Sequence, residues 1–220
     1  MTPRKIYEQE LAQLRDSLED MANLVEASLN NLLFAIENND DDLAKQIMKD
    51  DRQVNHLERK IEAQCLSLIT KQQPIASDLR MVSSILKVVT DIERIGDHAS
   101  DISELILRLH HVKLNAYSAH LQLMITAARE MVHNAVSAFI DRDKDRSAKV
   151  IASDDVVDEL FNNVKTDITH HLKSGCKGVD ECIDILMIAK YLERIGDHAV
   201  NICEWEIFKE TGAIEDTLVY

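Results

Sequence analysis

The chain has 220 residues, room for one large or two small domains, and 45% of them are hydrophobic, enough for a sizeable core. The 25 Lys and Arg against 39 Asp and Glu give a formal charge of −14, which repels a phosphate backbone and argues against nucleic-acid binding. Only 5 Gly, 2 Pro and 4% aromatic residues are present, which argues against strand-rich folds. Because no apolar run fits a membrane span or a signal peptide, we expect a soluble, cytoplasmic protein.

Apolar residues that recur every three or four positions predict three long amphipathic helices in the first half of the chain. The first covers about residues 11–36, the second about 43–68, and the third continues to about His111. An acidic turn at residues 38–42 separates the first two and supplies the N-cap of the second. We expect Pro74 to open the third helix, since its missing N–H costs nothing in a first turn.

The same pattern then begins again. It predicts a fourth helix over about residues 121–139, a fifth over about 150–172 and a sixth over about 180–209. Asp143, in a second charged turn, is the expected N-cap of the fifth helix. The last ten residues are expected to form a loose tail.

The second half also repeats the first residue by residue. The segment 92–102 recurs as 192–202, shifted by 100 residues, and the seven residues 93–99 are identical to their counterparts. The earlier helices match at a shift of 103, which pairs Asp51 with Asp154. The chain is therefore an internal duplication of a three-helix unit.

This duplication predicts the fold class. We expect an all-α protein built from two tandem three-helix bundles. The N-terminal bundle is expected to comprise residues 1–113, and the C-terminal bundle, with its short tail, residues 114–220.

Each copy of the repeated segment carries oxygen-bearing side chains at four-residue spacing. These residues are Glu93, Asp97 and Asp101 in the first copy and Glu193, Asp197 and Asn201 in the second. Side chains spaced by four lie on one face of a helix, here turned away from the apolar stripe, so we expect them to face outward. Neighbouring helices carry further donors: Asp51, Asn55 and Glu58 in the first half, and Asp154 and Asp158 in the second.

Two interpretations of these rows remain open from spacing alone. In the first, they form a solvated face whose acids are neutralised locally, for example Asp97 by Arg94 and Asp101 by His98. In the second, rows on adjacent helices together bind metal ions through their carboxylates.

The segment Glu-Arg-Ile-Gly-Asp-His near the end of each half, and residues 73–80 before the first copy, resemble the PhoU family. The resemblance covers essentially the whole chain. It implies two three-helix bundles related by a pseudo-twofold axis. It also implies that Glu93 and Asp97, and likewise Glu193 and Asp197, help to hold a multinuclear iron or zinc cluster. Other family members bind magnesium or manganese.

The resemblance further implies a regulatory function rather than a catalytic one. PhoU-like proteins are cytoplasmic negative regulators of phosphate uptake and of phosphate-starvation signalling. By resemblance, the expected partners are the ATPase of the phosphate ABC transporter and a sensor histidine kinase, which the protein would connect. A homodimer of this chain is a further expected assembly. In the residues themselves, no P-loop, nucleophile elbow or H-E-x-x-H motif is present, so we expect no catalytic residues. Because Asn201 replaces a carboxylate, the C-terminal site should be the weaker or smaller one.

Two alternatives belong to other functional classes. One is a purely structural helical adaptor whose acidic rows never bind metal. The other is a carboxylate-bridged di-iron oxidase, which needs Glu-x-x-His elements on two helices of a bundle and further glutamates on two others, all directed into the core. The chain has one such element, Glu130-x-x-His133, which disfavours the oxidase.

Overall fold

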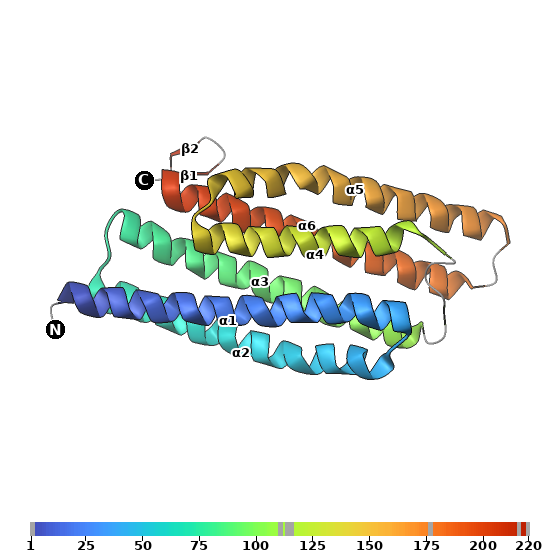
Figure 1. Cartoon of the computed structure of the whole chain (residues 1–220), viewed down its shortest axis with the longest axis horizontal. Coiled ribbons are helices and arrows are strands. Elements are labelled where there is room, and N and C mark those ends of the chain that lie inside the picture. Colours follow the sequence, from blue (N-terminus) through green and yellow to red (C-terminus); the bar gives the residue numbers. More distant parts are fainter. Residues whose placement is uncertain (1–2, 110–111, 113–116, 176–177, 215–216, 219–220) are drawn as a thin grey trace.

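The computed structural model describes residues 3–109, 112, 117–175, 178–214 and 217–218. Its helices run along the length of an elongated molecule, with α1 to α3 on one side and α4 to α6 on the other (Figure 1). The elements are α1 (Pro3–Asn38), α2 (Asp41–Gln72), α3 (Ser77–Arg108), α4 (His120–Asp141), α5 (Lys144–Lys173), α6 (Val179–Thr211), β1 (Ala213–Ile214) and β2 (Thr217–Leu218). The prediction of an all-α fold with two tandem three-helix units is confirmed.

Both predicted N-caps are confirmed. The Asp40 side chain accepts hydrogen bonds from the backbone N–H groups of Asp42 and Leu43 at the start of α2, at 3.1 and 3.0 Å. The Asp143 side chain accepts from the N–H of Arg146 at 2.9 Å at the start of α5. Each aspartate thus satisfies donors that have no partner inside the helix.

The prediction that Pro74 opens the third helix is wrong. The residue that caps α2, Gln73, adopts the left-handed conformation (φ 45°), and Ala76, just before α3, also has a positive φ of 49°. A right-handed helix does not pass through such residues, so Pro74 lies in the turn between them and α3 begins at Ser77.

Three further expectations concern chain ends and connections. The third helix ends at Arg108, and its expected end at His111, like the expected boundary between residues 113 and 114, lies outside the described residues. At the C-terminus, α6 ends before Gly212, which has a positive φ of 76°. The described part of the expected loose tail then forms a short antiparallel pairing of β1 with β2.

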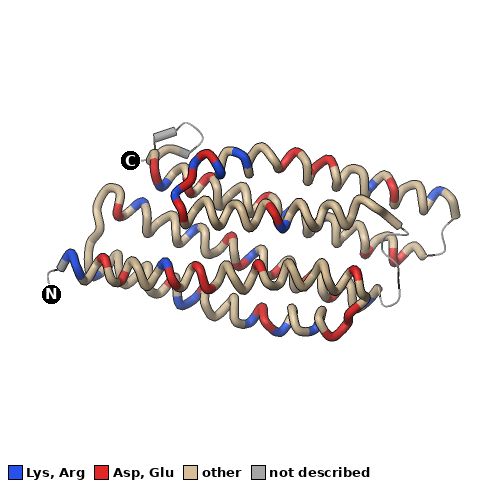
Figure 2. Tube along the Cα trace, in the orientation of Figure 1, with Lys and Arg blue, Asp and Glu red and all other residues tan. Residues whose placement is uncertain are grey.

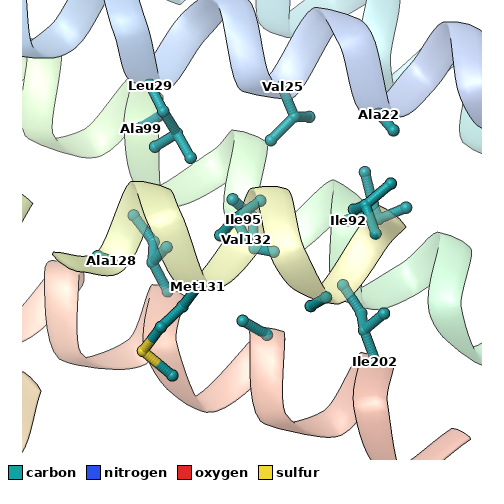
Figure 3. Close-up of a cluster of buried hydrophobic side chains, with 14 of the residues drawn as sticks. Ala22, Val25, Leu29, Ile92, Ile95, Ala99, Ala128, Met131, Val132 and Ile202 are labelled. Atoms are coloured by element: carbon teal, nitrogen blue, oxygen red, sulfur yellow. The ribbon is translucent and has the colours of Figure 1, made fainter. Parts of the chain in front are cut away.

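The two triplets share one hydrophobic core. Helix α3 packs on α6, and α1 packs on α4. Figure 3 shows Val25 of α1, Ile95 of α3, Val132 of α4 and Ile202 of α6 gathered together, and all four are buried. Among the described residues, no helix is both long and apolar enough to cross a membrane.

One part of this interior is charged. Glu206 and Lys209, one turn apart on α6, are both buried and form an ion pair. Lys209 Nζ also donates to the backbone oxygen of Phe139 at 2.9 Å. The first repeat has Ile106 and Leu109 at the corresponding positions, so the duplication supplies an apolar version of the same site.

We predict that Lys209→Ala lowers the free energy of unfolding by about 3–5 kcal/mol, because it leaves the Glu206 carboxylate buried without its partner. Replacing both residues by those of the first repeat, Glu206→Ile with Lys209→Leu, should cost little or stabilise the protein. Urea denaturation followed by circular dichroism measures both changes. An equal loss in the single and the double variant would contradict the prediction.

Candidate functional site

A glycine in the repeated segment lets neighbouring helices come close. A Cβ atom on Gly96 of α3 would lie 3.2 Å from Val54 Cγ1 and 3.5 Å from Asp51 Oδ1 of α2. On Gly196 of α6, it would lie 3.3 Å from Asp154 Oδ1 of α5. Glycine inside a helix lowers its stability by about 1 kcal/mol relative to alanine. Both repeats have this glycine at the point where an aspartate of the neighbouring helix lies against it.

In the first repeat, this approach brings together the acidic side chains that the sequence pattern singled out. Asp51, Asn55 and Glu58 of α2 and Glu93 and Asp97 of α3 form what we call the N-terminal acidic cluster. Burial, then the charges of Asp97 and Glu58, raise the pKa of Glu93 to about 7. Burial and the charge of Asp97 likewise raise the pKa of Asp51.

The expectation that these acids face outward needs correction. The Glu93 side chain is only 14% exposed and that of Asp97 33%. They lie away from the apolar stripe of α3, as predicted, but α2 covers that face in part. The carboxylates of Glu93 and Asp97 therefore lie partly buried between α2 and α3, where water screens their mutual repulsion less than on an open surface.

Two oxygens of the N-terminal acidic cluster are buried without a hydrogen-bond partner. Asn55 Nδ2 donates to Asp51 Oδ2 at 3.0 Å, which leaves Asp51 Oδ1 and Asn55 Oδ1 unsatisfied. Buried oxygens without partners are uncommon in folded proteins and call for an explanation such as an ion or a water molecule.

Local neutralisation, the basis of the solvated-face interpretation, is also present. Arg94 Nη1 lies 3.2 Å from Asp97 Oδ2, and Arg94 Nε lies 3.6 Å from Glu93 Oε2. The guanidinium is largely exposed, and exposed ion pairs contribute about 0–1 kcal/mol. Arg94 lowers the pKa of Glu93, but burial and the neighbouring carboxylates dominate.

The second repeat contains an equivalent group. Asp154 and Asp158 of α5 with Glu193 and Asp197 of α6 form the C-terminal acidic cluster. Burial, Asp158 and Asp197 are the largest causes that raise the pKa of Asp154 to about 6. Burial and Glu193 also raise the pKa of Asp197.

Both clusters have cations beside them: burial raises the pKa of Glu58 in the first repeat while Arg94 and Arg59 lower it, and lysines take that place in the second. Lys190 forms an ion pair with Glu193. At the shift of 103, Phe161 stands where the first repeat has Glu58, and Lys165 where it has Glu62. The ammonium groups of Lys165 and Lys190 lie over the Phe161 ring, at 5.8 and 5.5 Å from its centroid. The two glutamates at this end of the N-terminal acidic cluster therefore have no acidic counterpart in the second repeat.

The structure places Asp101 and Asn201 at the contact between α3 and α6, beside the clusters. Asn201 Nδ2 donates to Asp91 Oδ1 at 3.1 Å, and Asp101 Oδ2 lies 3.8 Å from Nδ1 of His98, whose ring packs against Tyr191. Sequence reasoning missed Asp91 and Tyr191. The signal was available, because these two positions are also 100 residues apart, directly beside the repeated segment. The ligand role of Asp101 and Asn201 stays a prediction.

The Glu130-x-x-His133 element does not point into the core. His133 Nδ1 lies 3.0 Å from Glu26 Oε2 of α1, and its side chain is 61% exposed. This placement disfavours the di-iron oxidase. Asp and Glu are spread over all the helices (Figure 2). In the arrangement of the described side chains, no three His, Cys, Asp or Glu residues are placed to hold one metal ion.

Comparison with known proteins gives the same family for both halves. The family model described as "PhoU domain" matches residues 18–106 and 121–205. A phosphate-specific transport system accessory protein PhoU homolog of Clostridium acetobutylicum is 34% identical over 210 residues, covering 95% of this chain and 96% of that protein. The accessory protein PhoU of Escherichia coli is 30% identical, covering 94% of this chain and 86% of that protein.

Solved structures agree with this result. The crystal structure of PhoU from Pseudomonas aeruginosa matches with a TM-score of 0.87 at 32% identity, covering 94% of this chain and all of that one. A phosphate transport system regulatory protein PhoU from Streptococcus pneumoniae matches with a TM-score of 0.88 at 27% identity, covering 96% of this chain and all of that one. With the family model matched twice and these likenesses over nearly its whole length, the chain belongs to the PhoU family.

Proposed function

We propose that the protein is a cytoplasmic accessory protein of phosphate transport that represses phosphate uptake and phosphate-starvation signalling. As an adaptor, and not an enzyme, it links the ATPase of the phosphate ABC transporter to the sensor histidine kinase. The observation that carries this proposal is the match of both repeats to the PhoU domain, together with full-length relatives named as accessory proteins of phosphate-specific transport.

We also propose that the acidic clusters bind metal cations. The donors in the N-terminal acidic cluster would be Asp51, Glu58, Glu93 and Asp97, with Asn55 beside them. An all-oxygen donor set suits magnesium and manganese, and carboxylates also bridge iron ions in helical bundles. The buried, unpartnered oxygens of Asp51 and Asn55 support this assignment. A bound cation would supply the positive charge that these carboxylates lack.

The donor chemistry favours magnesium, manganese or iron over zinc. Zinc sites in proteins usually include imidazole or thiolate ligands, and neither acidic cluster contains them. An iron-containing multinuclear cluster therefore remains part of the proposal.

The two acidic clusters are expected to differ in affinity. Lys190 forms an ion pair with Glu193 of the C-terminal acidic cluster, and Phe161 stands where the N-terminal acidic cluster has Glu58. We therefore place the stronger site in the N-terminal repeat. The structural adaptor without metal is the alternative, favoured by the ion pairs of Arg94 and Lys190.

We predict that Asp97→Ala removes more bound metal than Asp197→Ala does, because the cluster of Asp97 contains the buried, unpartnered oxygens of Asp51 and Asn55. Metal content is measured by mass spectrometry on protein purified without chelator, with helicity checked by circular dichroism. Asp50→Ala is the matched control, since Asp50 precedes Asp51 on α2 and bonds to Gln46 and Gln53 instead. Near-zero metal in the wild type and in all variants would support the structural adaptor.

The metal-free protein should lose stability as the pH rises from 5 to 8. Because the pKa of Glu93 is about 7 in the fold against 4.5 ordinarily, the fold favours the protonated carboxyl. That contribution is complete below the unfolded pKa and is lost as the pH passes the folded one. Glu93→Gln should flatten the profile and gain on the order of 1 kcal/mol at pH 8. Thermal melts after dialysis against EDTA measure this, and identical profiles for both proteins would refute it.

Deletion of the gene should derepress phosphate-starvation genes in phosphate-rich medium, because the adaptor would no longer restrain the kinase. A reporter fused to a phosphate-starvation promoter measures the effect. Complementation with wild-type protein should restore repression, and the native protein should co-purify with the transporter ATPase and the kinase. Unchanged reporter activity, with transporter and kinase intact, would argue against the regulatory role.

A further inference from the structure

The contact between α3 and α6 brings together two histidines, one from each repeat, that correspond at the shift of 100 residues. The rings of His98 and His198 lie 5.6 Å apart between their centroids, with 35° between their planes. Their side chains are largely buried, at 12% and 21% exposed, respectively. Neither histidine belongs to an acidic cluster, so the cation binding proposed above does not account for this pair.

A carboxylate of α3 lies beside Nδ1 of each ring. Asp91 Oδ1 lies 2.9 Å from His198 Nδ1, and Asp101 Oδ2 lies 3.8 Å from His98 Nδ1. Because Asp91 and Asp101 are ten residues apart on one helix, they flank the pair of rings from opposite ends. A carboxylate next to Nδ1 favours the tautomer with its proton on that atom, which leaves the lone pair of Nε2 free to bind a metal ion.

The separation of the two rings suits an ion shared between them. Nδ1 and Nε2 lie on opposite edges of an imidazole, so carboxylates at the outer ends leave the Nε2 edges for the space between the rings. Two metal–nitrogen bonds of about 2 Å, with half a ring on each side, together span roughly 6 Å, which is close to the measured 5.6 Å. In addition, His98 Nδ1 is buried without a hydrogen-bond partner, and such an atom calls for an explanation.

We propose that His98 and His198 hold one transition-metal ion between the two repeats, through Nε2 of each ring. Imidazole suits zinc, copper and nickel, whereas magnesium and manganese prefer oxygen ligands. Water would complete the coordination, since the described side chains place no group of three His, Cys, Asp or Glu around one ion. Asp91 and Asp101 would be positioning residues that orient the rings.

The test is a Zn²⁺ titration of the full chain, labelled with ¹⁵N at histidine, in saturating Mg²⁺, which occupies oxygen sites and leaves imidazoles free. We expect one equivalent of Zn²⁺ to shift the ring nitrogens of both His98 and His198 in two-dimensional NMR spectra. His98→Asn and His198→Asn each remove Nε2 and keep an amide in the place of Nδ1. Each should weaken Zn²⁺ binding at least about tenfold, because removing a ligand costs no less than removing a residue that orients one.

Two further variants separate the parts of the site. Asp91→Asn keeps both imidazoles and removes the carboxylate beside His198, so it should weaken Zn²⁺ binding about tenfold. His133→Asn is the matched control, because His133 Nδ1 also lies beside a carboxylate, 3.0 Å from Glu26 Oε2, but its side chain is 61% exposed on α4. It should bind Zn²⁺ as the wild type does. Circular dichroism and thermal melts check that each variant is folded.

The NMR measurement on the wild type decides the proposal even where a variant fails to fold. Ring nitrogens of His98 and His198 that stay in place while Zn²⁺ binds would put the ion elsewhere and refute the site. A shift at one of the two histidines alone would refute a shared ion. If no Zn²⁺ binds in the presence of Mg²⁺, the site falls as well, but the proposed cation binding by the acidic clusters, which uses other atoms, is unaffected.

Discussion

The approach of α2 to α3, and of α5 to α6, governs the chemistry of this molecule. At Gly96 and Gly196 no side chain separates the helices, and an aspartate oxygen of the neighbouring helix lies 3.5 and 3.3 Å, respectively, from the place that a Cβ atom would take. Carboxylates that would repel one another mildly on an open surface are brought into partly desolvated clusters. Their repulsion is a cost of the fold in the absence of counter-charge, and the burial of apolar side chains around each glycine, Val54 and Val157 among them, must outweigh it.

Duplication kept this scaffold and altered its electrostatics. In the first repeat, α2 carries Glu58 and Glu62 beside the carboxylates that both repeats share. In the second repeat, Lys190 pairs with Glu193, and Phe161 with Lys165 takes the place of two glutamates. A fold held together by one continuous core tolerates such changes, because they lie at the surface of the helix pairs and leave the shared apolar layer intact.

Periodicity and capping chemistry predicted the six helices, since each depends only on neighbouring residues. The position of Pro74 could not be predicted in that way, because its turn is set by the positive φ of Gln73 and Ala76, which local composition does not reveal. The sequence predicted which residues form the acidic sites, but not their burial or their contacts with other helices. Four-residue spacing identified one face of each helix, but how far α2 covers Glu93, and the contact of His198 with Asp91, depend on packing between helices.

The packing of α3 on α6 also connects the two acidic clusters. Each carboxylate cluster lies between two helices of a repeat, and α3 and α6 connect the clusters through the His98–His198 contact. The proposed cation at either cluster would add positive charge on a helix that also packs against the other repeat. The polar part of that contact is made by Asp91 with His198 and Asn201, whereas the layer shared by α1 and α4 is apolar, with Val25 and Val132 among its members. The α3–α6 contact, where His198 and Asn201 of the second repeat meet Asp91 of the first, is therefore the polar connection between the helices that carry the two clusters.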